Sequence, residues 1–270
     1  MESLGYSAPT LATRAVRLAG GIATSVEETI AEETPITIAY NAVAHAVMMA
    51  TPADLEDFAV GFSLTEGLID RADAVQSVAV VRYSRGIELQ IETSAEVAAG
   101  TRSRRLSGRT GCGICGKADV EEVLRALPRV ESSARFSAAA IARAMSELAA
   151  RQPLNAATGG VHAAGWADAA GALALVREDV GRHNALDKLI GALSRAGQAA
   201  EARTGFVALT SRGSFELVQK AAVLGVQLLA TVSAPTGLAI RVANDAGITL
   251  AGFARDERVT LYTHAERVTP

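Results

Sequence analysis

The second half of this chain alternates short apolar segments with amphipathic ones, and this alternation restricts the fold more than any other feature. Leu186, Leu189, Ile190 and Leu193 fall on one helical face, and the helix that they predict ends near Gly197. Strands and helices in alternation are typical of a mixed sheet with helices on both faces. The other expected helices are 214–230 and 236–246, and the expected strands are 172–176, 206–210, 230–233, 248–253 and 258–262.

The first half carries fewer helical signals and more strand signals. Thr51-Pro52-Ala53-Asp54 predicts a helix start with a cap, a first-position proline and an acid in the first turn. Ser137 is expected to cap a second helix, and a third is expected from Val120. Strands are expected at 35–40 and 46–49 around a turn at Asn41, and at 77–81 and 87–91 around Arg85-Gly86.

These patterns divide the chain into three parts. Residues 1–30 predict a loosely held N-terminal arm. Residues 31–117 predict a smaller N-terminal α+β portion that ends in a cysteine-containing loop. Residues 118–270 predict the α/β core.

Composition excludes several classes of function. The net charge of −3 gives no overall attraction to nucleic acid or membrane, and 4% aromatic residues argue against a base-stacking surface. No apolar run reaches the roughly 18 residues that a membrane span needs. The N-terminus lacks the pattern of a secretory signal, so we expect a cytoplasmic protein.

The only two cysteines, Cys112 and Cys115, form a C-x-x-C motif between glycines. The segment 102–117 contains five cations and no acid, which favours the thiolate form. The N-terminus of the helix expected next favours the thiolate of Cys115 further. An ionised thiol on a glycine-rich loop suits a sulfur carrier, which holds a sulfur atom as a persulfide. The second thiol can then release that atom and leave a disulfide.

Other uses of two cysteines stay open. Zinc would need two further ligands from four scattered histidines, and a zinc deaminase would need an H-x-E motif that is absent, because Ala163 and Ala164 follow His162. A dithiol oxidoreductase would place the motif directly after a strand, whereas the preceding segment predicts a loop. Two inert cysteines are the remaining alternative. We expect no permanently bound metal.

Six segments resemble the FdhD/NarQ family of formate dehydrogenase accessory proteins, in the family's order. They are CGICGK (112–117), TGGVHAA (158–164), EDVGRHNALDKLIG (178–191), SRGSFELVQKA (211–221), APTGLAIRVAN (234–244) and GITLAGFARDERVTLYTH (247–264). The resemblance implies a homodimer with a three-layer α/β/α, cytidine-deaminase-like core. It implies sulfur transfer from a cysteine desulfurase to the molybdenum cofactor, molybdenum bis(molybdopterin guanine dinucleotide), before insertion into formate dehydrogenase.

The resemblance also assigns residues. It implies that Cys112 carries the persulfide and that Cys115 assists, although the helix-dipole argument alone slightly favours Cys115. It implies a cofactor-binding segment at Phe253, Ala254, Arg255, Asp256, Glu257 and Arg258. The two arginines can bind phosphate or pterin oxygens, and an acid can accept guanine N–H groups. A charged β-turn is the plain alternative.

Other polar positions have two interpretations each. Ser211-Arg212-Gly213-Ser214 precedes a helix and suits a phosphate, or Ser214 simply caps that helix. His162, His183 and Asn184 could contact a cofactor or lie in the core. Two rival functions follow: a dithiol oxidoreductase, and a cofactor chaperone without catalytic cysteines.

Overall fold

A computed structural model describes residues 8–97, 127–131 and 134–270. Cys112, Cys115, the basic segment around them and the helix expected from Val120 lie outside the described residues. None of the described helices is long and apolar enough to cross a membrane.

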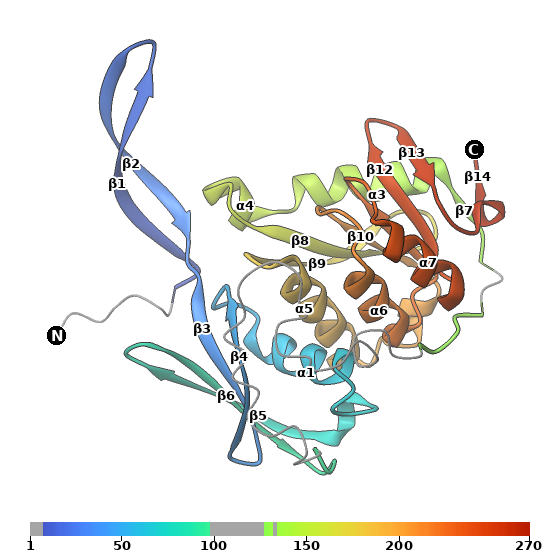
Figure 1. Ribbon diagram of the computed structural model, residues 1–270, viewed down its shortest axis with the longest axis horizontal. Helices are drawn as coiled ribbons and strands as arrows, with labels where there is room; N and C mark the ends of the chain where they lie inside the picture. Colours follow the sequence, from blue (N-terminus) through green and yellow to red (C-terminus); the bar gives the residue numbers. More distant parts are fainter. Residues whose placement is uncertain (1–7, 98–126, 132–133) are drawn as a thin grey trace.

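The core is a six-stranded mixed sheet (Figure 1). Its order is β13-β12-β11-β10-β8-β9, with β10, β11 and β12 parallel and the other neighbours antiparallel. The strands are β8 (His162–Ala167), β9 (Leu173–Asp179), β10 (Phe206–Leu209), β11 (Leu228–Thr231), β12 (Thr249–Arg255) and β13 (Arg258–Leu261).

Helices cover both faces of this sheet, because successive residues of its strands point to opposite sides. Phe206 and Ala208 pack toward α3 (Ala138–Ala150), whereas Val207 and Leu209 pack toward the opposite helical layer. That layer contains α5 (Arg182–Arg195), α6 (Phe215–Leu224) and α7 (Gly237–Ala246). The mixed α/β fold with helices on both faces is confirmed. Smaller elements are α4 (Pro153–Thr158) and the parallel pair β7 (Phe136–Ser137) and β14 (Val268–Thr269).

A second sheet, in the order β4-β3-β6-β5, lies beyond the α5–α7 layer (Figure 1). It consists of β3 (Thr34–Tyr40), β4 (Val43–Ala50), β5 (Val75–Tyr83) and β6 (Gly86–Thr93). Helix α1 (Leu55–Thr65) packs one side against this sheet and the other against α5. The predicted turn at Asn41 and the hairpin around Arg85-Gly86 are confirmed.

Two glycines allow helices α1 and α5 to pack so closely that their backbones are in contact. A Cβ atom on Gly61 would lie 1.7 Å from the carbonyl oxygen of Asp187, and one on Gly191 would lie 1.8 Å from that of Asp57. Both distances are far below a van der Waals contact. The close crossing therefore depends on glycine at both positions.

The N-terminal segment forms a hairpin that projects from the body (Figure 1). β1 (Thr10–Ala19) pairs antiparallel with β2 (Ile22–Ala31) through a turn at Gly20-Gly21, where φ is 57° and 79°. Positive φ at both central residues is the requirement of a type I′ turn. The sequence predicted only a loosely held arm here, so the regular strand pairing was missed.

Three other local predictions were wrong. Helix α1 starts at Leu55 rather than Pro52, and the Thr51 hydroxyl accepts from the N–H of Val180 instead of capping the helix. Helix α6 ends at Leu224, because Gly225 adopts a left-handed conformation and closes it. Strand β8 was not expected, although it is an interior strand of the sheet, between β10 and β9. The Ser137 cap is confirmed by its hydrogen bond from the N–H of Ala140.

Candidate functional site

The carboxyl ends of β9, β10, β11 and β12 lie at one edge of the core sheet, and the N-termini of α5, α6 and α7 follow them there. A β-bridge and backbone hydrogen bonds connect three loops at this edge. Gly213 pairs with Pro235, the N–H of Thr236 donates to the oxygen of Gly213 at 2.9 Å, and that of Phe253 donates to Ser233 at 3.3 Å. Ligands of open α/β sheets bind at such an edge.

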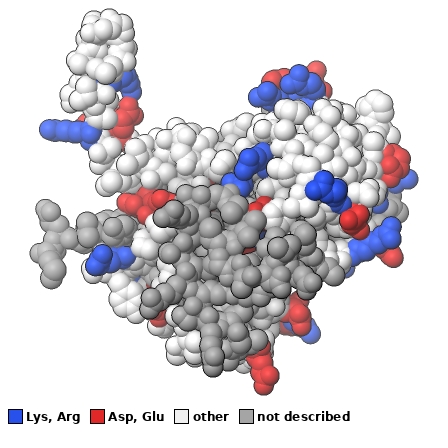
Figure 2. Space-filling view, in the orientation of Figure 1, with Lys and Arg blue, Asp and Glu red and all other residues white. Residues whose placement is uncertain are grey.

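The predicted cofactor segment, residues 253–258, forms the end of β12, a tight turn and the start of β13. Asp256 and Glu257 occupy the turn with φ of 51° and 60°, and Phe253 has φ of 51° at a β-bulge. Positive φ is uncommon outside glycine, especially for a bulky residue such as Phe253. Figure 2 shows acidic and basic side chains together at this tip.

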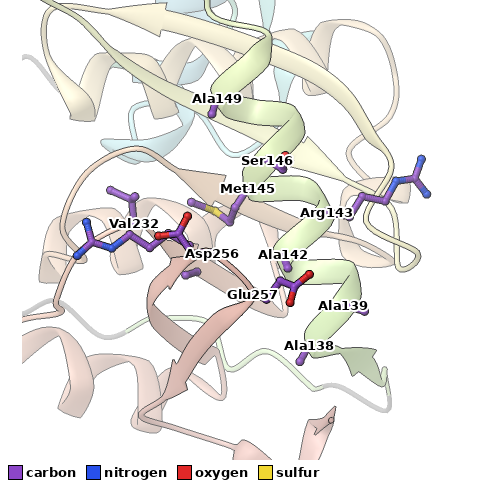
Figure 3. A pocket seen from close by; sticks show the side chains of 12 residues that line it. Ala138, Ala139, Ala142, Arg143, Met145, Ser146, Ala149, Val232, Asp256 and Glu257 are labelled. Atoms are coloured by element: carbon purple, nitrogen blue, oxygen red, sulfur yellow. The ribbon is translucent and has the colours of Figure 1, made fainter.

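This segment lines one side of a groove of about 730 Å³ (Figure 3). Ala254, Arg255, Asp256 and Glu257 face the groove, whereas Phe253 and Arg258 are not part of its lining. The opposite wall is helix α3, which contributes mainly small residues together with Met145 and Arg143. A groove of this size with an apolar wall and a few charged groups is typical of small-molecule sites.

The EDVGRHNALDK segment contains a buried ion pair. The side chains of Asp179 and Lys188 are both fully buried, with 2.7 Å between Oδ2 and Nζ. Asp179 also accepts from the N–H groups of Thr51 and Gly181 and from the side chain of Asn184, at 2.8–3.0 Å. Lys188 donates to the carbonyl oxygen of Thr51 at 2.9 Å. Asp179 therefore fixes the core to the strand-helix connection before α1. The side-chain nitrogen of Asn184 is part of this internal network.

A second buried pair joins α6 to α5 and α1. Lys220 Nζ lies 2.9 Å from Asp187, 3.0 Å from the Thr65 hydroxyl and 3.1 Å from Glu66. Burial lowers the pKa of Lys220, but the carboxylates of Asp187 and Glu66 outweigh burial and hold this pKa above its ordinary value. A third group, Asp57, pairs with Arg177 at 2.7 Å and with Arg195.

A further polar cluster lies where α5 and α6 begin. His183 Nε2 is 3.9 Å from Glu216 Oε2, and His162 lies nearby at the start of β8. Burial, reinforced by the charges of Arg182 and His183, lowers the pKa of His162. Burial raises the pKa of Glu216, but His183, Ser214 and the backbone N–H of Glu216 together hold this pKa below its ordinary value.

Ser214 occupies the cap position of α6 with an extended backbone, but its side chain makes no capping hydrogen bond. The interpretation of Ser214 as a simple helix cap is therefore wrong. Within residues 8–97, 127–131 and 134–270, no group of three or more acids, histidines and cysteines could hold a metal ion.

Sequence reasoning missed Lys188 and Lys220, the two buried lysines. A signal was present, because each lysine lies within a run of helical residues that are otherwise largely apolar, LDKLIGAL and LVQKAAVL. A charged residue on an apolar helical face predicts a buried partner. Their partners Asp179 and Asp187 lie within ten residues of Lys188 in the sequence. The pairing of Asp187 with Lys220, however, is set by the tertiary packing of α5 against α6.

The fold and the site at the edge of the core sheet define the class of protein. It is a mixed α/β protein in which buried ion pairs join a second sheet to the core. The chain belongs to the FdhD/NarQ family, whose model matches residues 31–269. It is 53% identical over 251 residues to the sulfur carrier protein FdhD of Xanthomonas campestris pv. campestris (strain B100), covering 92% of this chain and 89% of that one.

Two further relatives support the assignment. The sulfur carrier protein FdhD of Bordetella petrii is 48% identical over 276 residues, covering 99% of each chain. The crystal structure of a formate dehydrogenase accessory protein from Desulfotalea psychrophila superposes with a TM-score of 0.78 at 25% identity. That superposition covers 97% of this chain and 100% of the other.

Proposed function

We propose that this protein is a sulfur carrier that activates formate dehydrogenase. Family membership is the observation that carries the proposal, since close relatives over nearly the whole chain are named sulfur carrier proteins. The C-x-x-C motif within a basic segment supplies the chemistry that such a function needs.

Each sulfur transfer can be written as a thiol exchange. The thiolate of Cys112 attacks the outer sulfur of a cysteine desulfurase persulfide, and the desulfurase thiolate leaves. The thiolate of Cys115 then attacks the inner sulfur of the Cys112 persulfide, and the outer sulfur departs as hydrosulfide to the acceptor. A disulfide between Cys112 and Cys115 remains, and a cellular thiol reduces it. This step gives the second cysteine of the motif a role.

We propose molybdenum bis(molybdopterin guanine dinucleotide) as the acceptor. The groove beside α3 supports this choice, because residues 254–257 line it and its volume of about 730 Å³ is within the range of small-molecule and cofactor sites. Arg255 is exposed at its rim, where a guanidinium can pair with phosphate oxygens. Phe253 and Arg258 would shape the turn rather than line the groove.

We also propose that the protein forms a homodimer in the cytoplasm. The β1-β2 hairpin supports the dimer, because Val16, Leu18 and Ile22 are 68–76% exposed on it. A two-stranded sheet alone is marginally stable in water, and its free strand edges invite pairing with another chain. A second copy of this chain, docked on the hairpin, would cover those residues.

Reconstitution tests the acceptor and the transfer together. Purified protein, a cysteine desulfurase, cysteine, the free cofactor and apo-formate dehydrogenase should together yield active enzyme. Cys112→Ala should abolish the activation, and Arg255→Ala should weaken it. Full activation by a variant with serine at both cysteines would refute sulfur transfer and favour a cofactor chaperone. Rapid reduction of insulin disulfides without any cofactor would favour a dithiol oxidoreductase.

A further inference from the structure

The N-terminus of α6 contains hydrogen-bonding groups that the described residues leave unused. Ser214 is only 5% exposed, yet its hydroxyl has no hydrogen-bond partner in the described part of the chain. The same holds for His183 Nε2 in the first turn of α5. A buried polar atom without a partner costs free energy, so native proteins rarely keep one without a function.

These two groups and Glu216 lie together at the open edge of the sheet. His183 Nε2 is 3.9 Å from Glu216 Oε2, which is too far for a hydrogen bond, so the two side chains interact through charge while Nε2 keeps no hydrogen-bond partner among the described residues. The side chains retain 14% and 11% exposure, so a small group can reach them from the edge. The cluster is therefore a partly closed polar site rather than a sealed part of the core.

Glu216 decides which charge the site accepts. Its pKa is held below the ordinary value, partly by its own backbone N–H in the first turn of α6, so it is ionised at neutral pH. A carboxylate thus already occupies the helix N-terminus that the sequence offered to a phosphate. A second anion is disfavoured there. The site instead needs a ligand whose N–H groups face the carboxylate.

The three side chains have complementary roles. The Glu216 carboxylate can accept two N–H groups, while the Ser214 hydroxyl and an Nε2–H of His183 can donate to one carbonyl oxygen. A ring N–H flanked by an exocyclic amine and a carbonyl group satisfies all of them. We propose that Ser214, His183 and Glu216 bind this amino-lactam edge, which guanine and the pterins share. The proposal rests on the proposed function, since the cofactor carries both rings.

Calorimetric titration of the purified protein tests the edge directly. GDP and ADP form one pair of probes, and pterin and lumazine form the other, because ADP and lumazine lack the amino-lactam edge. We expect GDP, pterin or both to bind about tenfold or more tightly than the matched probe, as expected for hydrogen bonds to a charged group. Selectivity within the first pair assigns guanine, and selectivity within the second assigns a pterin.

Two variants identify the residues. Glu216→Gln should abolish the selectivity while the affinity for ADP or lumazine stays unchanged. Ser214→Ala should weaken binding of the selected probe, yet keep the melting temperature, because the hydroxyl makes no hydrogen bond within the described residues. Glu266→Gln, at an exposed side chain, is the matched control and should bind as wild type does.

The absence of selectivity within either pair, or selectivity that survives in both variants, would overturn the assignment. So would a large loss of melting temperature in Ser214→Ala, which would show that the hydroxyl is structural. None of these results concerns sulfur loading of Cys112. Wild type that gains sulfur and activates formate dehydrogenase without edge-selective binding would refute this site and leave the proposed function intact.

Discussion

The pair of Asp179 and Lys188 predicts a large effect from one substitution. Lys188→Met removes the cation and keeps most of the side-chain volume. Asp179 then remains fully buried with its three hydrogen bonds but without the ammonium group at 2.7 Å. Removing one member of a buried pair typically costs about 3–5 kcal/mol, because the other charge is left uncompensated.

This cost should appear in thermal unfolding. For a chain of this size, about 3–5 kcal/mol corresponds to a fall in Tm of roughly 6–20 °C. Circular dichroism or scanning calorimetry of the reduced protein measures the fall. Arg143→Met is the matched control, because Arg143 forms only a surface pair with Glu147, and we expect a change of about 0.5 kcal/mol or less.

A double substitution isolates the electrostatic part. Asp179→Asn with Lys188→Met leaves no buried charge, so part of the loss should be recovered relative to Lys188→Met alone. A Lys188→Met protein that loses less than about 1 kcal/mol would contradict the reasoning. So would a double variant less stable than the sum of the two single changes. Either result would show that the pair does not hold the second sheet to the core.

Three further predictions concern packing, pH and the groove. Gly61→Ala should lower the free energy of unfolding by about 3 kcal/mol, because the new Cβ would overlap the Asp187 carbonyl. Gly237→Ala is the control and should not measurably destabilise the protein, because its Cβ would meet only Arg241 at 3.7 Å. Equal melting temperatures of the two variants would contradict this prediction. The pKa of His162 is lowered in the fold, which means that the folded protein favours the neutral imidazole. The contribution of His162 to stability is therefore present above about pH 6.5 and is lost as the pH falls below this value. His162→Gln should therefore lose less stability than wild type between about pH 7 and pH 5. Arg255→Ala should weaken cofactor binding about tenfold with stability within about 0.5 kcal/mol of wild type, and unchanged binding would exclude Arg255 from the site.

Much of the core could be predicted from its sequence because local patterns and tertiary packing agree there. Helices α5 and α7 lie close to their predicted positions, since their apolar faces match the period of a helix. Strand β8 escaped prediction for a physical reason. Alanine, glycine and histidine dominate it, and such residues have little strand propensity of their own. Pairing with β9 and β10 fixes it instead.

The strands of the N-terminal hairpin also escaped prediction from the sequence. Residues 10–31 contain both charged and apolar residues on each face of the hairpin, so no clear period marked its strands. Gly20-Gly21 was the available signal, because two adjacent glycines suit the turn. The site was also only partly predictable. The groove depends on how α3 packs beside residues 254–257, and the sequence gives no distance between those segments.

Lysines 188 and 220 illustrate which polar residues sequence reasoning misplaces. In the segment 178–191 the sequence left two interpretations open, contacts with a cofactor or positions in the core, and Asp179, Asn184 and Asp187 are internal hydrogen-bonding partners. Only the tertiary structure separates them from His183, which keeps an unused nitrogen at the edge. A motif rich in charged residues can thus hold two parts of a fold together while a neighbouring residue lies at the open edge of the sheet.

Mass spectrometry of Cys112 after incubation with a cysteine desulfurase and cysteine tests sulfur transfer most directly. Tryptic peptides alkylated before reduction should show Cys112 heavier by one sulfur atom, and the added mass should disappear after treatment with a reductant. Cys112→Ala should remove it from the peptide that contains Cys115. A wild-type protein that never gains this sulfur, or an unloaded Cys112→Ala protein that still activates formate dehydrogenase, would contradict the account.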